Sequence, residues 1–229
     1  MFSIQDNLTA LQARITRACS ASGRDQGSVR LVAVSKTRPA SELIEALAAG
    51  QRLFGENYVQ ELTEKARALS VDAEWHFIGH LQSNKVRHIA GLVSMIHSVD
   101  RLSLATEIDR QWRERVGRPC DLLVQVNISG EATKSGTTAD EAIRLVREIS
   151  LLPNTKVCGL MTMPPFFDDP EGARPYFRQL REIADAIRDE AIPGVEMTEL
   201  SMGMSGDFEV AIEEGATLVR VGTAIFGER

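Results

Sequence analysis

Eight short runs of β-forming residues alternate with segments of helical periodicity along the whole chain. The runs lie at residues 30–35, 52–54, 74–78, 94–97, 121–127, 156–160, 196–201 and 217–221. Between them, apolar residues recur every three or four positions, as they do on one face of an amphipathic helix. Parallel strands need helical crossovers, and eight strand–helix units are the number that closes into a barrel. The pattern therefore predicts an α/β fold, a single (β/α)8 TIM barrel domain over residues 1–229.

A further helix precedes the first strand. Ile4, Leu8, Leu11 and Ile15 recur at helical spacing, which predicts an N-terminal helix over about residues 3–22. The chain has no linker, low-complexity stretch or block of like charges, so one continuous domain is expected. An open doubly wound sheet is the alternative architecture, but no G-x-G-x-x-G motif follows the first strand.

Composition excludes several classes of function. The net charge of −6 argues against a general nucleic-acid binder, which would carry a dominant basic face. The three cysteines lie far apart and beside apolar residues, so buried thiols are expected. No leader peptide is visible, and no apolar run approaches the roughly 18 residues of a membrane helix. We therefore expect a cytoplasmic protein that binds neither nucleic acid nor membranes.

A metal site is not expected either. His76 and His80 have the spacing of an H-x3-H metal motif. His76 belongs to a predicted strand, however, and His80 lies beyond its end, so the two side chains would not share a helix face.

The ends of the predicted strands carry the candidate site, because active sites of such barrels lie at the C-terminal ends of the strands. The residues there are polar, small or cationic. They are Lys36, Asn57, His80, Gln82, Asn127, Met161, Ser201, Gly203, Arg220, Gly222 and Thr223.

Lys36 is the residue at these strand ends with the clearest chemistry. It is in phase with Val32 and Val34, so it would enter the barrel mouth if these valines face the interior. A partly buried ammonium loses hydration, which lowers its pKa and frees the amine to attack a carbonyl. The alternative is a lysine that merely leaves a strand end into solvent.

Two glycine-rich loops predict a phosphate site opposite Lys36. The loops after strands seven and eight commonly bind phosphate in these barrels. They contain Ser201, Gly203, Ser205, Gly222 and Thr223, whose backbone N–H groups and hydroxyls can contact a dianion. Each loop alone is equally consistent with ordinary turn and capping chemistry. Together with Lys36 they favour a phosphorylated carbonyl ligand.

Arg220 is a guanidinium within an otherwise apolar strand, and it needs a partner because an unpaired buried charge is costly. Glu199 is one possible partner. The functional alternative is the pyridine nitrogen of pyridoxal 5′-phosphate (PLP). An arginine that stays protonated would leave that nitrogen unprotonated, so the ring would be a poor electron sink and the site would restrain carbanion chemistry.

Several motifs together resemble one family. They include Val34-Ser-Lys-Thr37, Trp75-His-Phe-Ile-Gly-His-Leu-Gln-Ser-Asn-Lys85, Leu200-Ser-Met-Gly-Met-Ser205 and Arg220-Val-Gly-Thr-Ala-Ile-Phe-Gly227. The chain resembles the pyridoxal phosphate homeostasis proteins from Leu31 nearly to its end. The resemblance implies the fold-type III PLP barrel that is also the N-terminal domain of alanine racemase.

The resemblance also implies roles for individual residues. Lys36 would hold PLP as a Schiff base, and Arg220 would face the pyridine nitrogen. Four further residues would form the phosphate cradle and two would line the ring pocket: Ser201, Gly203, Gly222 and Thr223, then Asn57 and Met161. Lys134 matches a position linked to a second PLP-interacting surface, although a solvated loop lysine is the more ordinary interpretation.

The function implied by the resemblance is PLP (vitamin B6) homeostasis inside the cell, without established catalytic turnover. The protein would hold PLP and buffer or deliver it, with apo PLP-dependent enzymes as possible partners. We expect a monomer and assign no catalytic residue.

Two enzymatic alternatives remain. An amino-acid racemase would need a second acid–base group across the ring. In similar racemases a tyrosine from a second, β-rich domain of the partner subunit serves this purpose. This chain ends soon after the eighth run, with Tyr58 and Tyr176 as its tyrosines, so such a domain is not expected. A Schiff-base aldolase acting on a sugar phosphate is the weaker alternative.

Overall fold

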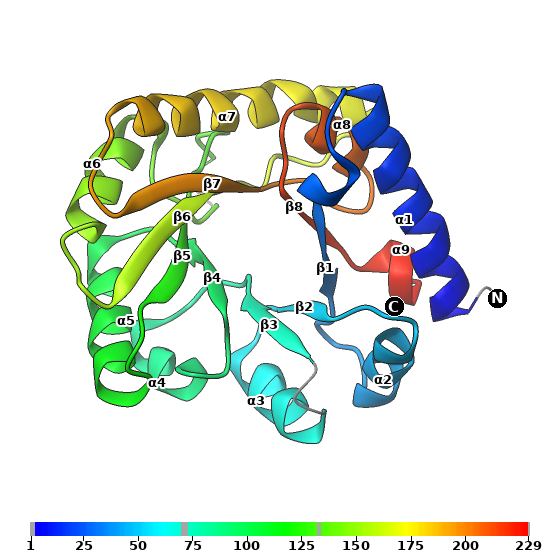
Figure 1. Cartoon of the computed structure of the whole chain (residues 1–229), viewed down its shortest axis with the longest axis horizontal. Helices are drawn as coiled ribbons and strands as arrows, with labels where there is room; N and C mark the ends of the chain where they lie inside the picture. The colour runs from blue at the N-terminus through cyan, green and yellow to red at the C-terminus, as the bar shows by residue number, and fades with distance from the viewer. Residues whose placement is uncertain (1–2, 70–72, 132–133, 229) are drawn as a thin grey trace.

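The eight strands form one closed parallel barrel in the computed structural model, which describes residues 3–69, 73–131 and 134–228 (Figure 1). Each strand pairs with the next one along the chain, and β8 returns to β1 through a register that aligns Arg220 with Val32. The strands are β1 Arg30–Val34, β2 Leu53–Glu56, β3 Glu74–Phe77, β4 Met95–Val99, β5 Cys120–Gln125, β6 Thr155–Met161, β7 Val195–Ser201 and β8 Leu218–Val221. The predicted TIM barrel is confirmed.

Helices surround the barrel (Figure 1). They are α1 Ile4–Ala21, α2 Ala40–Ala48, α3 Val59–Ala68, α4 Val86–Ile89, α5 Leu102–Arg115, α6 Ala139–Ile149, α7 Arg174–Asp189, α8 Phe208–Glu213 and α9 Thr223–Phe226. Helix α1 begins with a capping box in which Ser3 and Asp6 bond reciprocally, which is consistent with the predicted extra N-terminal helix. It packs against α8, where the Arg14 guanidinium lies 2.7 Å from the Glu209 carboxylate.

Some short helical elements are not visible in the periodicity of apolar residues along the sequence. Residues 83–85 and 170–173 are 3-10 turns that precede α4 and α7, and a third 3-10 turn spans 26–28. Asp169 caps the turn at 170–173 through a bond from the Glu171 backbone N–H, so the long helix α7 begins only at Arg174. The short helix α9 lies where a loop was expected. Segments this short carry too few apolar positions to reveal a period.

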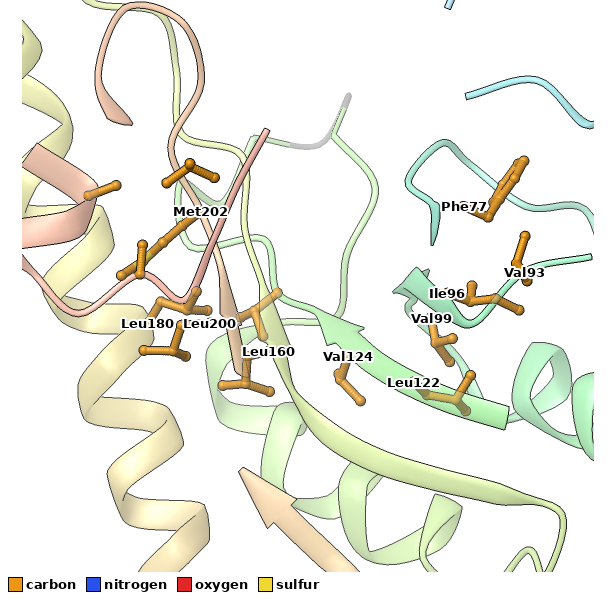
Figure 2. Close-up of a cluster of buried hydrophobic side chains, with 14 of the residues drawn as sticks. Phe77, Val93, Ile96, Val99, Leu122, Val124, Leu160, Leu180, Leu200 and Met202 are labelled. Atoms are coloured by element: carbon orange, nitrogen blue, oxygen red, sulfur yellow. The ribbon is translucent and has the colours of Figure 1, made fainter. Parts of the chain in front are cut away.

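Two apolar layers follow from the alternation of side chains along each strand. One layer lies between the strands and the helices, and Figure 2 shows part of it, including Leu160, Leu180 and Leu200. The other lies inside the barrel and consists of Val32, Leu53, Met95, Leu123, Cys158, Met161 and Leu218. Val32 therefore faces the barrel interior, which is the condition on which the expected direction of Lys36 depends. The next inward positions of β1 lead towards the barrel mouth.

Two expectations from composition can be compared with the structure. Cys19, Cys120 and Cys158 are buried free thiols, as expected, and burial raises the pKa of the Cys120 thiol well above its usual range. Within the described ranges, none of the helices is both long enough and apolar enough to cross a lipid bilayer.

Candidate functional site

A cavity of about 530 Å³ lies at the C-terminal ends of the strands. Its lining combines side chains from the first strand, from the loops after the second, third, sixth and seventh strands, and from the eighth strand and its loop. The described lining residues are Val34, Lys36, Arg38, Asn57, Ile78, Met163, Phe166, Phe167, Pro170, Ala173, Met204, Ser205, Gly206, Asp207, Arg220, Gly222 and Thr223. The lining thus contains five of the eight residues that the sequence analysis assigned to the site: Lys36, Asn57, Arg220, Gly222 and Thr223.

Lys36 lies two residues after the end of β1, and its neighbour Thr37 adopts a left-handed backbone conformation with a φ of 61°. Such a conformation is uncommon for a β-branched residue and needs support from its surroundings. The support comes from Glu61, whose carboxylate accepts a 2.7 Å hydrogen bond from the Thr37 backbone N–H. The turn after β1 is therefore held from outside the barrel while Lys36 lines the cavity.

Arg220 lies at the inner wall of the cavity with 4% of its surface exposed. Its Nη2 donates to the carbonyl of Thr162 at 2.8 Å, and its Nη1 donates to the hydroxyl of Ser201 at 2.5 Å. Among the described residues, no carboxylate forms an ion pair with this guanidinium. Burial lowers the pKa of Arg220 to about 10, which still leaves the group charged at neutral pH.

The alternative partner of Arg220, Glu199, is excluded by its position. The Glu199 carboxylate lies 2.8 Å from Arg30 and also accepts a hydrogen bond from Thr217 at 2.5 Å. These contacts lie at the N-terminal end of the barrel, away from the cavity. The charge of Arg220 is thus available to a ligand in the cavity.

The loops after β7 and β8 meet at one side of the cavity. The Ser205 hydroxyl lies 3.4 Å from the Gly222 backbone nitrogen, which brings the two loops together. Gly206 has open space where a Cβ would stand, while Thr223 begins α9. Asp207 turns back to accept a 2.6 Å hydrogen bond from the Met204 backbone N–H, and burial raises the pKa of its carboxyl. Hydroxyls and glycine backbone thus line one wall of the cavity.

Ser201, one of the expected phosphate contacts, is not part of the described cavity lining. Its side chain is completely buried and is absent from the cavity lining. Its hydroxyl contacts Arg220 and lies 2.9 Å from Nδ1 of His97. Two buried partners occupy this hydroxyl, so Ser205, four residues further along, takes its place beside the cavity. The sequence analysis named Ser205 as a suitable type but did not include it in the cradle.

Gly203 and Met161 are also outside the lining. Met161 belongs to the apolar cluster inside the barrel, below the cavity. Gly203 has a φ of 91°, and a Cβ there would stand 2.6 Å from the Cβ of Ala211. Glycine at this position therefore lets the loop after β7 pack against α8. Gly203 therefore contributes to the site through the shape of the loop after β7.

Asn57 supplies an unsatisfied polar atom. Its Oδ1 is buried and has no hydrogen-bond partner among the described residues. Buried polar atoms without a partner are rare, because each costs free energy. Since Asn57 lines the cavity, a donor on a bound molecule would satisfy this oxygen.

Other predicted features lie apart from the cavity. His76 points into the barrel and contacts His97, whereas His80 lies 3.4 Å from the Ser135 hydroxyl. The described residues form no group of side chains that could hold a metal ion. Lys134 pairs with Glu131 at 2.9 Å, and its link to a second PLP surface stays a prediction.

The aromatic rim and the pair His76–His97 are features that the sequence analysis missed. Phe166 and Phe167 come from the long loop after β6, and 85% of the Phe166 surface is exposed. No periodic pattern marks a loop residue as part of a rim. The two histidines each occupy an inward strand position, and only closure of the barrel brings them into contact.

Comparisons with known proteins agree with this geometry. The family model described as alanine racemase, N-terminal domain, matches residues 7–229. The pyridoxal phosphate homeostasis protein of Aquifex aeolicus is 47% identical, covering 98% of this chain and 97% of that protein. The human protein of the same description is 42% identical, covering 97% of this chain and 85% of that protein.

Solved structures give the same result. PipY of Synechococcus elongatus, solved with PLP bound, has a TM-score of 0.86 and 37% identity, covering 98% of this chain and all of that chain. A Bifidobacterium adolescentis protein has a TM-score of 0.90 and 42% identity, covering 97% of this chain and 94% of that chain. Alanine racemase of Corynebacterium glutamicum has a TM-score of 0.73, covering 98% of this chain and 62% of that chain; its 15% identity shows a shared fold alone.

Proposed function

We propose that this chain, which belongs to the pyridoxal phosphate homeostasis family, holds PLP as a Schiff base on Lys36 and buffers or delivers it in the cytoplasm. The observation that carries the proposal is the meeting of three groups around one cavity: the amine of Lys36, the guanidinium of Arg220 and the hydroxyl- and glycine-lined wall. The PLP bound in PipY supports PLP as the cofactor.

The residues present fit PLP in size and in chemistry. A cavity of about 530 Å³ is within the range that small-molecule sites occupy. The lining contains the unpaired Asn57 oxygen and the buried guanidinium of Arg220, which interacts electrostatically with Asp207 without forming an ion pair. A polar ligand would satisfy the oxygen and add a contact to the guanidinium. When bound, PLP supplies an aldehyde for an amine and an aromatic ring that can accept electrons.

Each side chain would have a distinct task. Lys36 would anchor the cofactor covalently, and Asn57 would contact the ring region. Arg220 would donate to the pyridine nitrogen and, since it remains charged, would leave that nitrogen unprotonated. Ser205, Gly222 and Thr223 would receive the phosphate. An anchored ring that withdraws few electrons suits retention of PLP better than turnover.

Besides Lys36, the described cavity lining offers the racemase alternative one acid–base side chain, Asp207, whose carboxylate accepts a hydrogen bond from the Met204 backbone N–H. That lining contains no tyrosine, histidine or cysteine. Tyr58 has 55% of its surface exposed outside the cavity, and Tyr176 on α7 packs against Phe167 with ring centroids 5.7 Å apart. We therefore propose that the protein has no appreciable racemase activity, which chiral analysis of alanine and serine after long incubation would test.

The decisive experiment is to trap the cofactor. Wild type loaded with PLP should show a visible absorption band, and borohydride reduction should fix PLP on the peptide that contains Lys36. Lys36→Ala should abolish both results. Lys156→Ala is the matched control, since that lysine pairs with Glu196 at the opposite end of the barrel. An adduct on another lysine in wild type would disprove the proposed anchor.

Delivery needs its own assay. PLP-loaded protein is mixed with a defined apo-enzyme, with and without a trap that consumes free PLP. Direct transfer predicts that the apo-enzyme gains activity even with the trap present. Gain only without the trap would restrict the function to buffering.

A further inference from the structure

A row of polar side chains crosses the barrel interior beneath the cavity. Arg220 of β8 donates to Ser201 of β7 at 2.5 Å, and the Ser201 hydroxyl lies 2.9 Å from Nδ1 of His97 on β4. Nε2 of His97 lies 2.9 Å from Nδ1 of His76 on β3. Nε2 of His76 lies 3.3 Å from the Glu74 carboxylate, which opens to solvent at the opposite end of the barrel. The proposed function uses none of the three residues beyond Ser201.

When both histidines are neutral, as their burial favours, the two ends of this row fix the direction of every hydrogen bond. A guanidinium can only donate and an ionised carboxylate can only accept. Ser201 therefore accepts from Arg220 and gives its own proton to Nδ1 of His97. His97 then donates through Nε2 to Nδ1 of His76, and His76 donates through Nε2 to Glu74. Each neutral imidazole thus carries its proton on Nε2.

The surroundings support neutral histidines. Burial lowers the pKa of His76, and it lowers the pKa of His97 well below its usual range. The charge of Arg220 adds to the effect at His97. The hydrogen bond from His76 is the main reason that the Glu74 carboxyl has a pKa near 2, so this end of the row is ionised.

We propose that His97, supported by His76, is a positioning residue that orients Arg220 towards the pyridine nitrogen of PLP through the hydroxyl of Ser201. A serine hydroxyl rotates freely, and its proton would repel the guanidinium if it pointed towards Arg220. The acceptor on His97 holds that proton away and leaves a lone pair for Nη1. With Nη2 bonded to the Thr162 carbonyl, two contacts then fix the plane of the guanidinium.

This inference rests on the proposed role of Arg220, and its test separates the two. The first measurement uses PLP-free protein, in which ¹⁵N NMR distinguishes protonated from unprotonated ring nitrogens. His97 and His76 should both show a protonated Nε2 and an unprotonated Nδ1 at neutral pH. A protonated Nδ1 on His97 would contradict the proposed directions of the hydrogen bonds in the row, whether or not the protein binds PLP.

The second measurement is the equilibrium affinity for PLP, followed by the visible absorption of the bound cofactor. His97→Leu removes the acceptor, and we expect binding to weaken by about tenfold or more, as when a hydrogen bond to a charged group is disturbed. His97→Asn places an amide oxygen near the position of Nδ1 and should recover most of the affinity. His88→Leu, an exposed histidine outside the row, is the control and should bind like wild type.

A double-mutant cycle keeps the proposal testable if His97→Leu folds poorly. Ser201→Ala should weaken PLP binding and shift the absorption maximum, since it breaks the row beside Arg220. His97→Met, which has a side chain of similar size but no such acceptor, should weaken binding in the wild-type background. It should have no further effect on affinity in the Ser201→Ala background, because the path to Arg220 is already interrupted. Independent, additive losses would show that the histidine acts only on general stability. If wild type itself does not bind PLP, the proposed function fails while the NMR result stands on its own.

Discussion

The ammonium of Lys65 lies 2.5 Å from a carboxylate oxygen of Glu56, and both groups are buried. The same ammonium donates to the backbone carbonyl of Ser35 at 2.7 Å, and the Ser35 hydroxyl donates to Glu56 at 2.7 Å. This ion pair therefore holds Ser35, which lies between the end of β1 and Lys36. The proposed cofactor anchor depends on a charged network that lies on the helix side of the strand.

Removing one member of this pair should be costly. Lys65→Met leaves the Glu56 carboxylate buried without its cation, so we expect the free energy of unfolding to fall by about 3–5 kcal/mol in urea denaturation. Adding Glu56→Gln to that variant should recover part of the loss. Lys156→Met breaks the exposed pair with Glu196 and should cost less than about 1 kcal/mol. Equal losses at the two lysines would contradict the structural role of Lys65.

Substitution of Ser205 and substitution of Ser201 should affect the affinities for PLP and for pyridoxal differently. Ser205→Ala or Thr223→Ala should weaken PLP binding by roughly 1.5–3 kcal/mol, because each removes a donor to a charged phosphate. Neither change should alter the affinity for pyridoxal, which lacks the phosphate. Ser201→Ala should weaken the binding of both ligands, since its hydroxyl contacts Arg220. Titration of each variant with both ligands checks this, and a Ser201→Ala effect confined to PLP would restore the phosphate role for Ser201.

Gly203 should tolerate no side chain. Its φ of 91° is unfavourable for alanine, and the added Cβ would stand 2.9 Å from the Phe208 Cα. We expect Gly203→Ala to lower the free energy of unfolding by roughly 2–4 kcal/mol. Gly206→Ala is the control in the same loop, because open space surrounds its Cβ position and it should leave stability nearly unchanged. Thermal and urea unfolding of the two variants provide the comparison.

Stability should fall on mild acidification because of the buried histidines. The pKa values of His97 and His76 lie below their usual value of about 6.5 in the folded protein. Below pH 6.5 the unfolded chain therefore binds protons that the folded protein does not. The free energy of unfolding should decrease with falling pH, by up to about 1.4 kcal/mol per pH unit for each histidine, until the folded-state pKa is reached.

Urea denaturation between pH 7.5 and 5.5 measures this slope. His97→Asn should reduce it, since one of the two histidines is then absent. Glu74, with a pKa lowered to about 2, contributes stability that is lost only below its usual value of about 4.5, outside this window. An unchanged slope in His97→Asn would show that His97 has the same pKa in the folded and the unfolded chain.

Several parts of the site could be predicted from the sequence because they depend on local order. The direction of Lys36 follows from its phase with Val32 and Val34 along one strand. The proximity of Gly222 and Thr223 to Lys36 is not local, but it follows from the closure of β8 against β1, which the pattern of eight strand–helix units predicts. Ser201 and Met161 were assigned to the cavity because they end their strands. A strand's last inward residue can still lie below the mouth, however, and its depth depends on the stagger of the neighbouring strands.

The sequence by itself determined the eight strand–helix units, the N-terminal helix and the phase of Lys36 with Val32 and Val34. These properties come from periodicity and from contacts within a few residues, so they are written in consecutive positions. Only the tertiary structure decided that Arg220, Ser201, His97 and His76 meet in one row. They come from four strands and touch only across the interior of the closed barrel, where burial then selects the one pattern of protons that satisfies every polar group.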